Sequence, residues 1–324
     1  MGKIVIYDGV CPKPYDQDTF QNEAMGGTEA TVLRIESLLQ GDGDVVLLQR
    51  GASKNNVSDI ASMAELQKDD VVITLRDPNA YIANKARHPR AKHILWLHDV
   101  VAGEYRNLMI ANLQGQQSDM VVVSSWHKTQ VSEAIKMDLP MRDHKLTVIY
   151  NPVDAYCTRT WNDYDKNKLV FFSSPHKGLP QVIEMFKVIK LSDPDMQLYV
   201  ANPGYYNDAD LPEGVHQLGK LPHKQVMEHV RSALCTFYPQ TSFPETFGLV
   251  LAESNALGTP VLSHTIGAAN EVLDYDRRQV MDCRDIGAVV DRVLSWKSAR
   301  PIVKKNPAFD LEVVRRAWVK HFRS

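Results

Sequence analysis

Short apolar runs alternate along this chain with longer segments in which apolar residues recur every three or four positions. The short runs are typical of buried strands, and the longer segments are typical of helices with one buried face. Regular alternation of the two predicts parallel sheets whose strands are joined by crossover helices. The pattern occurs twice, once on each side of a polar stretch at residues 151–168 that we interpret as a linker.

In the first half of the chain the apolar runs predict strands at Lys3–Tyr7, Val45–Leu48, Val71–Leu75, His93–Leu97, Met120–Val123 and Leu146–Ile149. The helical patterns between them lie near Gly27–Leu39, Ser58–Glu65, Asn79–Ala86, Ala102–Asn112 and Trp126–Met137. In the second half we expect strands at Leu169–Ser173, Gln197–Ala201, His216–Leu218, Leu234–Tyr238, Pro260–Ser263 and Arg278–Met281. The helices expected there lie near Lys177–Leu191, His223–Arg231, Phe247–Leu257 and Asp285–Trp296.

The length of 324 residues exceeds what a single hydrophobic core usually holds, and two domains of about 150 residues each are the simplest division. We expect an N-terminal domain at residues 1–151 and a C-terminal domain at residues 152–308, each a doubly wound α/β sheet of the Rossmann type. A last helix, within residues 309–324, has no strand after it. Ligands of such sheets bind at the carboxyl ends of the strands, so functional groups are expected just after strands.

Composition and charge exclude several classes of protein. Hydrophobic residues make up 44% of the chain and charged residues 23%, as in ordinary globular proteins. The net charge of −2 argues against nucleic acid as the main partner, because phosphate backbones are bound by basic surfaces. The four cysteines are scattered without a C-x-x-C pair, which is typical of reduced thiols. No apolar run suits a signal peptide or a membrane span, so we expect a cytoplasmic protein.

The stretch Ser242–Val261 carries the most informative pattern, S-F-P-E-T-F-G-L-V-L-A-E-S-N-A-L-G-T-P-V. It predicts a turn that contains Glu245 and then the helix at Phe247–Leu257, with Glu253 about two turns inside. Two carboxylates at this spacing do not form an adjacent pair on one helix face. We therefore expect them to contact different parts of a long ligand.

The expected start of this helix suits a phosphate group. The amides of Phe247, Gly248 and Leu249 lie in its first turn, where backbone donors have no intrahelical acceptor. Gly248 has no side chain to keep a ligand away from the backbone. A nucleotide-sugar fits this arrangement, with its diphosphate at the helix start, its hexose hydroxyls on Glu245 and its ribose hydroxyls on Glu253.

These residues resemble a known family. The E-x7-E spacing within P-E-T-F-G-L-V-L-A-E, followed by A-L-G-T-P-V, looks like the donor-site signature of family-four retaining glycosyltransferases of the GT-B fold, the glycosyl transferases group 1. The resemblance covers most of the chain and is most specific from Ser173 to Val261. It implies two facing Rossmann-like domains, an N-terminal one for the acceptor and a C-terminal one for the nucleotide-sugar donor. It also implies that the C-terminal helix crosses back onto the N-terminal domain.

In the first half, the resemblance assigns roles to groups that follow the first and fourth expected strands. Gly26 and Gly27 open a long helix, and the resemblance implies that their loop contacts the distal phosphate of the donor and part of the acceptor. His98 follows a strand and matches the strand-end histidine of the family, where it would bind a sugar hydroxyl or the acceptor. A satisfied loop histidine is the alternative for His98, which we do not expect to be a strong base.

In the second half, Lys177 follows a strand at the start of the next expected helix, where an ammonium group could neutralise a pyrophosphate. The resemblance implies that Lys177 binds donor phosphate. Many relatives have an arginine a few residues earlier, where Ser173 or Ser174 stands here, so Lys177 would carry more of the leaving-group charge. Gly219 lies in the loop where relatives hold the nucleotide base by backbone contacts.

The expected catalytic residues are Glu245, Lys177 and His98. The expected donor-binding residues are Gly26, Gly27, Ser173, Lys177, Gly219, Glu245, Thr246, Phe247, Gly248, Leu249 and Glu253.

We expect no metal ion and no cofactor, with a nucleoside-diphosphate-sugar of unknown base as co-substrate. D-x-D triplets, which hold metal and diphosphate in the other major glycosyltransferase fold, occur at Asp16/Asp18, Asp193/Asp195 and Asp208/Asp210. All lie in turn-like sequence, which explains them without a metal. Helix and loop amides together with Lys177 could stabilise the departing phosphate instead.

The function predicted from the sequence is a retaining, metal-independent hexosyltransferase of polysaccharide biosynthesis. Its partners would be a nucleotide-sugar donor and a glycan or glycolipid acceptor. The basic run Arg87–His93 is interpreted as a solvated face, with an anionic acceptor or the inner face of a membrane as the alternative. Oligomeric state and linkage are not indicated by any pattern in the sequence.

Three alternatives differ in what they bind or convert. An epimerase-like GT-B enzyme would convert a nucleotide-sugar without an acceptor. A Rossmann oxidoreductase would bind a nicotinamide cofactor, but the G-x-G-x-x-G fingerprint is absent from the chain. A non-catalytic protein that binds nucleotide-sugar or glycan would keep the pocket, and Glu245→Ala would then leave its function unchanged.

Overall fold

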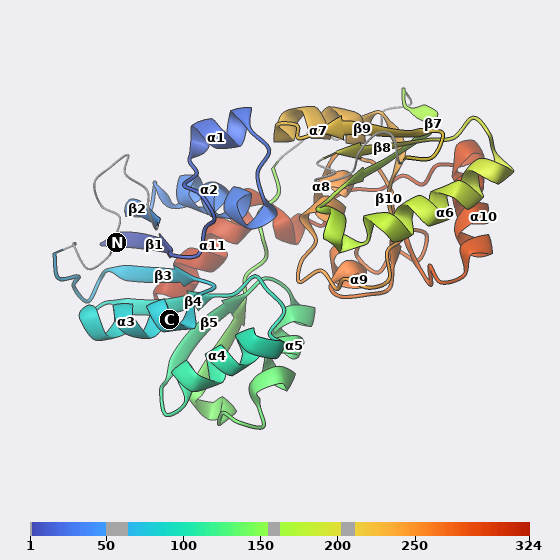
Figure 1. The fold of residues 1–324 in the computed structure, drawn as a ribbon. Coiled ribbons are helices and arrows are strands. Elements are labelled where there is room, and N and C mark those ends of the chain that lie inside the picture. The colour runs from blue at the N-terminus through green and yellow to red at the C-terminus, as the bar shows by residue number, and fades with distance from the viewer. Residues whose placement is uncertain (1, 50–63, 155–162, 202–210) are drawn as a thin grey trace. The chain divides into compact units, whose positions relative to one another are not determined.

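The structure is a computed structural model that describes residues 2–49, 64–154, 163–201 and 211–324. Two compact units make up the chain, and each contains a parallel sheet of six strands with helices around it (Figure 1). The alternation of apolar runs and helical patterns therefore gives the α/β architecture expected from it.

The first unit consists of Met1–Asp16, Gly26–Pro152 and Leu311–Ser324. Its sheet has the strand order β2-β1-β3-β4-β5-β6, in which every described pair is parallel. The strands are β1 (Lys3–Asp8), β2 (Asp44–Gln49), β3 (Val71–Leu75), β4 (Lys92–Trp96), β5 (Ser118–Val122) and β6 (His144–Val148). The helices are α2 (Gly27–Leu39), α3 (Pro78–Arg87), α4 (Gly103–Leu113), α5 (Ser125–Ile135) and α11 (Leu311–Phe322), with a 3₁₀ turn at Met141–Asp143.

Local sequence signals fix where several of these helices begin. The Asp77 carboxylate accepts a hydrogen bond from the Ala80 amide at 3.0 Å, and Pro78 follows it at the first helical position of α3. The Ser124 hydroxyl caps α5 in the same way, accepting from the His127 amide at 2.9 Å. Both caps lie just beyond a strand, so the two helices begin at the carboxyl edge of the sheet.

Helix α11 packs in the first unit although it follows the second unit in sequence. Trp318 is fully buried, and its ring meets that of Trp96 edge-on with the centroids 5.1 Å apart. The Lys92 ammonium donates to the Ser324 carbonyl at 3.0 Å. The C-terminal helix thus completes the core of the first unit.

The second unit consists of Gln17–Met25 and Val153–Asp310. Its sheet has the order β12-β11-β10-β7-β8-β9. The strands are β7 (Asp165–Phe172), β8 (Gln197–Ala201), β9 (Val215–Gly219), β10 (Ala233–Tyr238), β11 (Val261–His264) and β12 (Val280–Met281). The helices are α1 (Gln17–Asn22), α6 (Leu179–Ser192), α7 (His223–Arg231), α8 (Leu249–Ala256), α9 (Ala269–Val272) and α10 (Ile286–Ser298), with 3₁₀ turns at Pro175–Lys177 and Pro307–Phe309.

The short helix α1 belongs to the second unit although its sequence lies within the N-terminal part of the chain. Its sequence, Q-D-T-F-Q-N, has no apolar periodicity, and no helix is expected there from the sequence. It lies against α7, so its packing comes from residues that are remote in sequence.

The structure differs from the expected elements at several other places. Lys177, the expected first residue of a helix, ends a 3₁₀ turn, and α6 begins only at Leu179 after Gly178. The strand expected at Arg278–Met281 is limited to Val280–Met281, and the short helix α9 is not expected from the sequence. Strand β7 begins at Asp165, four residues before the expected Leu169, because its polar start pairs with Ala233 of β10. Helix α8 begins at Leu249, and the expected residues Phe247 and Gly248 are not helical. Of the helix expected at Ser58–Glu65, residues 58–63 lie outside the described residues, and residues 64 and 65 are not helical.

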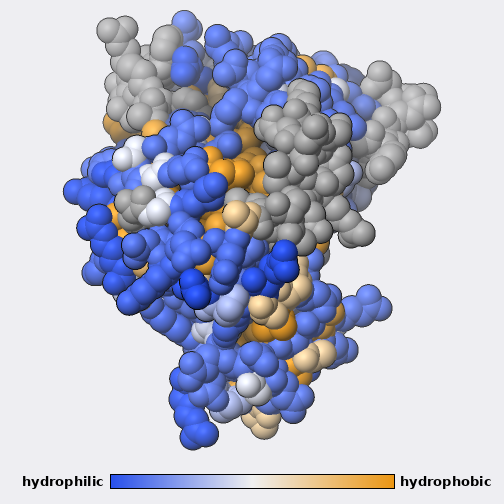
Figure 2. Space-filling view, turned by 90° about the vertical axis from the view of Figure 1, so that its left-hand side faces the viewer, coloured by the Kyte–Doolittle hydropathy of each residue, from blue (hydrophilic) through white to orange (hydrophobic). Residues whose placement is uncertain are grey.

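Polar side chains cover most of the face that Figure 2 shows, and apolar side chains gather in a few separate areas of it. No helix among the described residues is long and apolar enough to cross a membrane.

Candidate functional site

The turn that carries Glu245 follows β10 and is held together by Gln240. This buried side chain accepts hydrogen bonds from the amides of Ser242 and Phe243 at 3.0 and 2.8 Å and donates to the Phe243 carbonyl at 2.7 Å. These bonds fix the backbone of a loop that has no regular secondary structure. Glu245 is therefore placed at the carboxyl edge of the sheet, as its sequence position predicts.

Glu245 forms an ion pair with Lys177 and a hydrogen bond with Tyr238. The Lys177 ammonium lies 2.9 Å from each oxygen of the Glu245 carboxylate, and the Tyr238 hydroxyl donates to Oε1 at 2.7 Å. The Glu245 side chain is 10% exposed and that of Lys177 is 25% exposed. The Lys177 ammonium also lies 4.7 Å from the centre of the Phe243 ring. The structure thus brings together two of the three expected catalytic residues.

Tyr238, which has no motif around it, is a member of this cluster that the sequence does not reveal. Burial and then the Glu245 carboxylate raise the pKa of the Tyr238 hydroxyl, so it stays protonated and donates. Ser173, expected to bind the donor, lies next to this hydroxyl and acts on its pKa in the opposite direction. Ser173 therefore borders the Lys177–Glu245 pair.

The start of α8 carries the other expected phosphate contacts. Gly248 precedes the helix with φ +90°, in the left-handed region that glycine adopts readily. No side chain caps α8, and its first amides, beginning with Leu249, have no acceptor within the helix. Phe247, expected to be the first helical residue, is instead buried outside the helix, with its ring 4.9 Å from that of Phe309. Thr246, between Glu245 and Phe247, is half-buried.

The loop around Gly267 supports the backbone of Glu245. The Ala268 amide donates to the Glu245 carbonyl at 2.9 Å, and Gly267 adopts φ +63°. A Cβ atom at Gly267 would lie 2.5 Å from the Glu245 carbonyl oxygen and 2.6 Å from its amide nitrogen. This loop therefore holds Glu245 in place by close backbone packing.

Glu253 lies inside α8 and is 4% exposed. His223, the first residue of α7, donates from Nε2 to Glu253 Oε1 at 2.9 Å, because an ionised carboxylate can only accept. Gly219, at the end of β9, has φ +71° and precedes this helix by a short loop. Glu253 and Gly219 thus occupy the same side of the second unit, with His223 between them in sequence.

Three expected site residues belong to the first unit. Gly26 is the residue before α2 and Gly27 is its first residue, and no side chain caps this helix. His98 follows β4, is 7% exposed and packs against the Trp96 ring. Burial, and then the charges of Arg76 and His127, lower the pKa of His98 well below its usual value, so its imidazole is neutral.

Arg76 is a charged group of this edge that the sequence does not single out. It follows β3 with φ +57°, a conformation uncommon for a residue with a side chain. Its guanidinium lies 3.8 Å from the buried Asp8 carboxylate and 3.6 Å from Glu29 in the first turn of α2. Tyr15 donates to Asp8 at 2.8 Å. A polar network therefore joins the ends of β1 and β3 to the start of α2.

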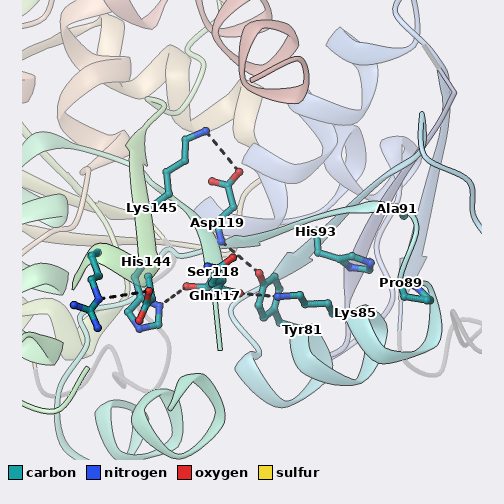
Figure 3. A pocket seen from close by; sticks show the side chains of 12 residues that line it. Tyr81, Lys85, Pro89, Ala91, His93, Gln117, Ser118, Asp119, His144 and Lys145 are labelled. Atoms are coloured by element: carbon teal, nitrogen blue, oxygen red, sulfur yellow. Dashed lines mark hydrogen bonds and ion pairs between the residues drawn. The ribbon is translucent and has the colours of Figure 1, made fainter. Parts of the chain in front are cut away.

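A separate pocket of about 440 Å³ lies at the opposite edge of the first sheet, where β4, β5 and β6 begin (Figure 3). Its lining includes His93 of the basic run. Its charged groups interact with other residues of the lining: Lys145 lies 3.9 Å from Asp119, and Lys85 donates to the Gln117 carbonyl at 2.7 Å. Because ligands of doubly wound sheets bind at the other edge, this pocket is not part of the candidate site.

The basic run itself divides between surface and core. Arg87 and Arg90 are exposed, whereas His88 and His93 are buried, and Lys92 lies 3.7 Å from Asp119. No group of three or more His, Cys, Asp or Glu among the described residues is arranged to hold a metal ion. The third D-x-D triplet, Asp208/Asp210, lies outside the described residues.

Comparisons with known proteins agree with this architecture. Residues 161–307 match the family described as glycosyl transferases group 1, and this stretch contains Lys177, Glu245 and Glu253. A curated relative, an uncharacterized glycosyltransferase of Methanocaldococcus jannaschii, is 26% identical over 202 residues, which are 60% of this chain and 54% of the relative. The chain therefore spans about half the length of that relative.

Several solved structures are similar along the whole chain. The Anabaena protein HepE in complex with UDP and glucose has a TM-score of 0.71 at 14% identity, with 99% of each chain covered. A glycosyltransferase from Rickettsia africae has a TM-score of 0.69 at 15% identity, covering 99% of this chain and 97% of its own. Sucrose-phosphate synthase from Thermosynechococcus elongatus has a TM-score of 0.67 at 14% identity, covering 100% and 98%. With its two parallel six-stranded sheets, the chain has the GT-B fold, which confirms the predicted fold class.

Proposed function

We propose that this chain is a retaining glycosyltransferase that moves a hexosyl group from a nucleoside-diphosphate-sugar to a glycan or glycolipid, without a metal ion. The observation that carries the proposal is the cluster at the start of α8. There the Lys177 ammonium pairs with the Glu245 carboxylate, which shortly precedes the N-terminus of α8, in the stretch that matches the glycosyl transferases group 1 family.

Each part of this cluster has a separate task in the proposed reaction. Lys177 and the first amides of α8, including that of Leu249, hold the diphosphate and stabilise the charge that develops as it departs. Glu245, fixed by Tyr238 and by the Gly267 loop, accepts hydrogen bonds from hydroxyls of the donor sugar. Glu253 accepts from the ribose. In the first unit, the Gly26–Gly27 loop contacts the distal phosphate of the donor and part of the acceptor. The neutral His98 binds a sugar hydroxyl or the acceptor.

The proposed transfer breaks the bond between the sugar C1 and the diphosphate oxygen and forms a bond between C1 and the acceptor oxygen. The acceptor proton passes to the departing diphosphate oxygen, so no strong protein base is needed. Attack on the face that the diphosphate leaves retains the configuration at C1. Glu245 is the carboxylate that the proposal assigns to the donor sugar, and its ion pair with Lys177 suits hydroxyl binding better than nucleophilic attack.

Lys177 is the cation that stands in for a metal in this proposal. Its ammonium already faces an anionic partner, the Glu245 carboxylate, at 2.9 Å. A bound diphosphate would compete for the same charge, and the helix amides would supply further donors without requiring a metal. Titration with and without EDTA tests this part of the proposal directly.

The first experiment measures thermal shifts with UDP, GDP, ADP and NAD, in the presence of magnesium and in EDTA. The expected result is a shift with one nucleoside diphosphate that is equal in both buffers and is reduced in Glu253→Ala. UDP is the first choice because HepE was solved with UDP and glucose. A thermal shift with NAD alone would overturn the proposal, and so would the absence of a shift with every nucleotide.

The second experiment follows the donor. Hydrolysis or transfer of a UDP-hexose by the wild type, lost in Glu245→Ala, is expected, and NMR of the product gives the configuration at C1. A product of inverted configuration would contradict retention. Conversion of the donor to another nucleotide-sugar without an acceptor would replace the transferase by an epimerase.

A further inference from the structure

The carboxylate of Glu253 is oriented by a residue outside its own helix. Glu253 is 4% exposed, and its Oε1 receives a hydrogen bond of 2.9 Å from His223 Nε2. Buried in this way, the carboxylate has little rotational freedom beyond what its partners allow. An ionised carboxylate has about four lone-pair positions, of which the bond from His223 takes one.

His223 is itself held by the helix to which it belongs. It is the first residue of α7, directly after Pro222, and Val226, Met227 and Val230 follow it on the same face of that helix, where they are buried. The burial of this face fixes the backbone of α7 and with it that of His223. Only the side-chain torsions of His223 then remain to be set.

Helix α1 restricts those torsions. The Phe20 ring lies against the imidazole of His223, with the ring centroids 5.6 Å apart and the planes at 31°. Both residues are in the second unit, because the segment Gln17–Met25 packs there and not with its neighbours in sequence. Phe20 therefore fixes the imidazole on one side while Glu253 fixes its Nε2 on the other.

We propose that His223 is a positioning residue that orients Glu253 for the two ribose hydroxyls of the donor, and that Phe20 holds His223 in that orientation. The inference rests on the proposed function, since it concerns how the same donor site distinguishes ribose from a sugar without these hydroxyls. A carboxylate fixed to accept from hydroxyls discriminates strongly against a sugar that lacks them, because its buried lone pairs are then left unpaired. The donor site is thus selective for ribonucleotides over deoxyribonucleotides through residues of α1 and α7.

Two substitutions separate the hydrogen bond from the ring contact. His223→Phe keeps an aromatic ring against Phe20 but removes the donor to Glu253. His223→Gln keeps an amide that can donate to Glu253 but removes the ring. Phe20→Leu reduces the contact from α1, and Phe20→Ala removes it. Gln225→Ala, at an exposed position of α7, is the matched control for His223.

The experiment measures dissociation constants for UDP, GDP and ADP and for their 2′,3′-dideoxy counterparts by calorimetry. For the base that binds, we expect the wild type and Gln225→Ala to prefer the ribonucleotide by about a hundredfold, the value of two hydrogen bonds to a charged group. His223→Phe should lower that ratio about tenfold, the value of one hydrogen bond to a charged group, while binding of the dideoxy compound is unchanged. His223→Gln should restore most of the ratio, and Phe20→Ala should lower it while Phe20→Leu has a smaller effect.

Three results would overturn the inference. If His223→Phe prefers the ribonucleotide over the dideoxy compound as strongly as the wild type does, Glu253 does not depend on His223 for its orientation. Equal weakening of both compounds would make the role of His223 merely structural. Tighter ribonucleotide binding in His223→Phe would mean that His223 competes with the ribose for Glu253. In all three cases nucleotide binding itself persists, so the proposed function stands, whereas absence of any nucleotide binding by the wild type overturns both.

Discussion

The Lys177 ammonium lies 2.9 Å from both carboxylate oxygens of Glu245, although 68 positions separate the two residues in sequence. The pair is largely withdrawn from water, and Tyr238 adds a third contact to it. In the proposed reaction the same two groups bind the leaving diphosphate and the donor sugar. Stability and function therefore depend on the same atoms. A double substitution that removes both charges should restore stability without restoring function.

Lys177→Met should lower stability and donor binding together. The substitution leaves the Glu245 carboxylate without its ion-pair partner, which we expect to lower the free energy of unfolding by about 2 kcal/mol. The double variant Lys177→Met/Glu245→Gln removes the unpaired charge and should recover most of this stability without recovering transfer. Urea unfolding and donor consumption, measured on the same preparations, check this. Recovery of transfer in the double variant would contradict the assigned roles.

Gly267→Ala should disrupt the donor site more than its size suggests. Its Cβ would lie 2.5 Å from the Glu245 carbonyl oxygen, and φ +63° is unfavourable for alanine. We expect a loss of more than about 1 kcal/mol in the free energy of unfolding, together with weaker binding of nucleoside diphosphates. Gly287→Ala is the control: it lies in α10, its nearest neighbour would be 3.4 Å away, and a stability gain of up to about 1 kcal/mol is expected. Similar losses in both variants would contradict this account.

Stability should fall as the pH drops from about 6.5 towards 4. Burial lowers the pKa of His127 to about 4, so the folded protein excludes a proton that the unfolded chain binds at the ordinary histidine value. The stabilising contribution is complete above the unfolded value and is lost as the pH falls. The shift of His98 acts in the same direction.

The variant His127→Gln tests this dependence, since Gln can still donate to the Asp99 carbonyl that receives His127 Nε2 at 2.9 Å. Near pH 5, its free energy of unfolding should depend on pH less steeply than that of the wild type, by about 1.4 kcal/mol per unit. Thr129→Ala, at an exposed position of the same helix, should keep the wild-type slope. Equal slopes for wild type and His127→Gln would exclude the effect.

Trp318→Ala should destabilise the first unit by about 3–5 kcal/mol, because it empties a fully buried site. The change also removes the edge contact with Trp96 at 5.1 Å. Val313→Ala, on the exposed side of α11, should change stability by less than about 0.5 kcal/mol. Denaturation followed by circular dichroism distinguishes the two. A small effect of Trp318→Ala would mean that α11 contributes little to this core.

The sequence predicts the regular elements well where burial dictates the pattern. The bounds expected for β3, α2 and α7 are those observed, because a buried parallel strand is a continuous apolar run and an amphipathic helix repeats its apolar positions. Helix α1 could not be predicted in this way. Its six residues carry no periodic pattern, and its packing depends on α7.

The candidate site shows the same division. Glu245, Glu253 and Lys177 are indicated by local spacing, and their assignment as donor ligands stays a prediction that the nucleotide experiments test. Tyr238 and His223, which fix the two carboxylates, carry no local signal, since each meets its partner only through the fold. The positions of contacts between remote residues are set by strand order and helix packing, which a single sequence does not specify.

The division of the chain between the units constrains the order in which the protein can fold during synthesis. Helix α11, which fills the core of the first unit, follows all of Val153–Asp310 in sequence. The first sheet is therefore translated early, but Trp96 is covered only after α11 has been synthesised. Helix α1 likewise leaves the ribosome long before α7, its partner in the second unit. Both early segments remain incomplete until the later ones emerge, which exposes apolar surface to chaperones for most of the translation time.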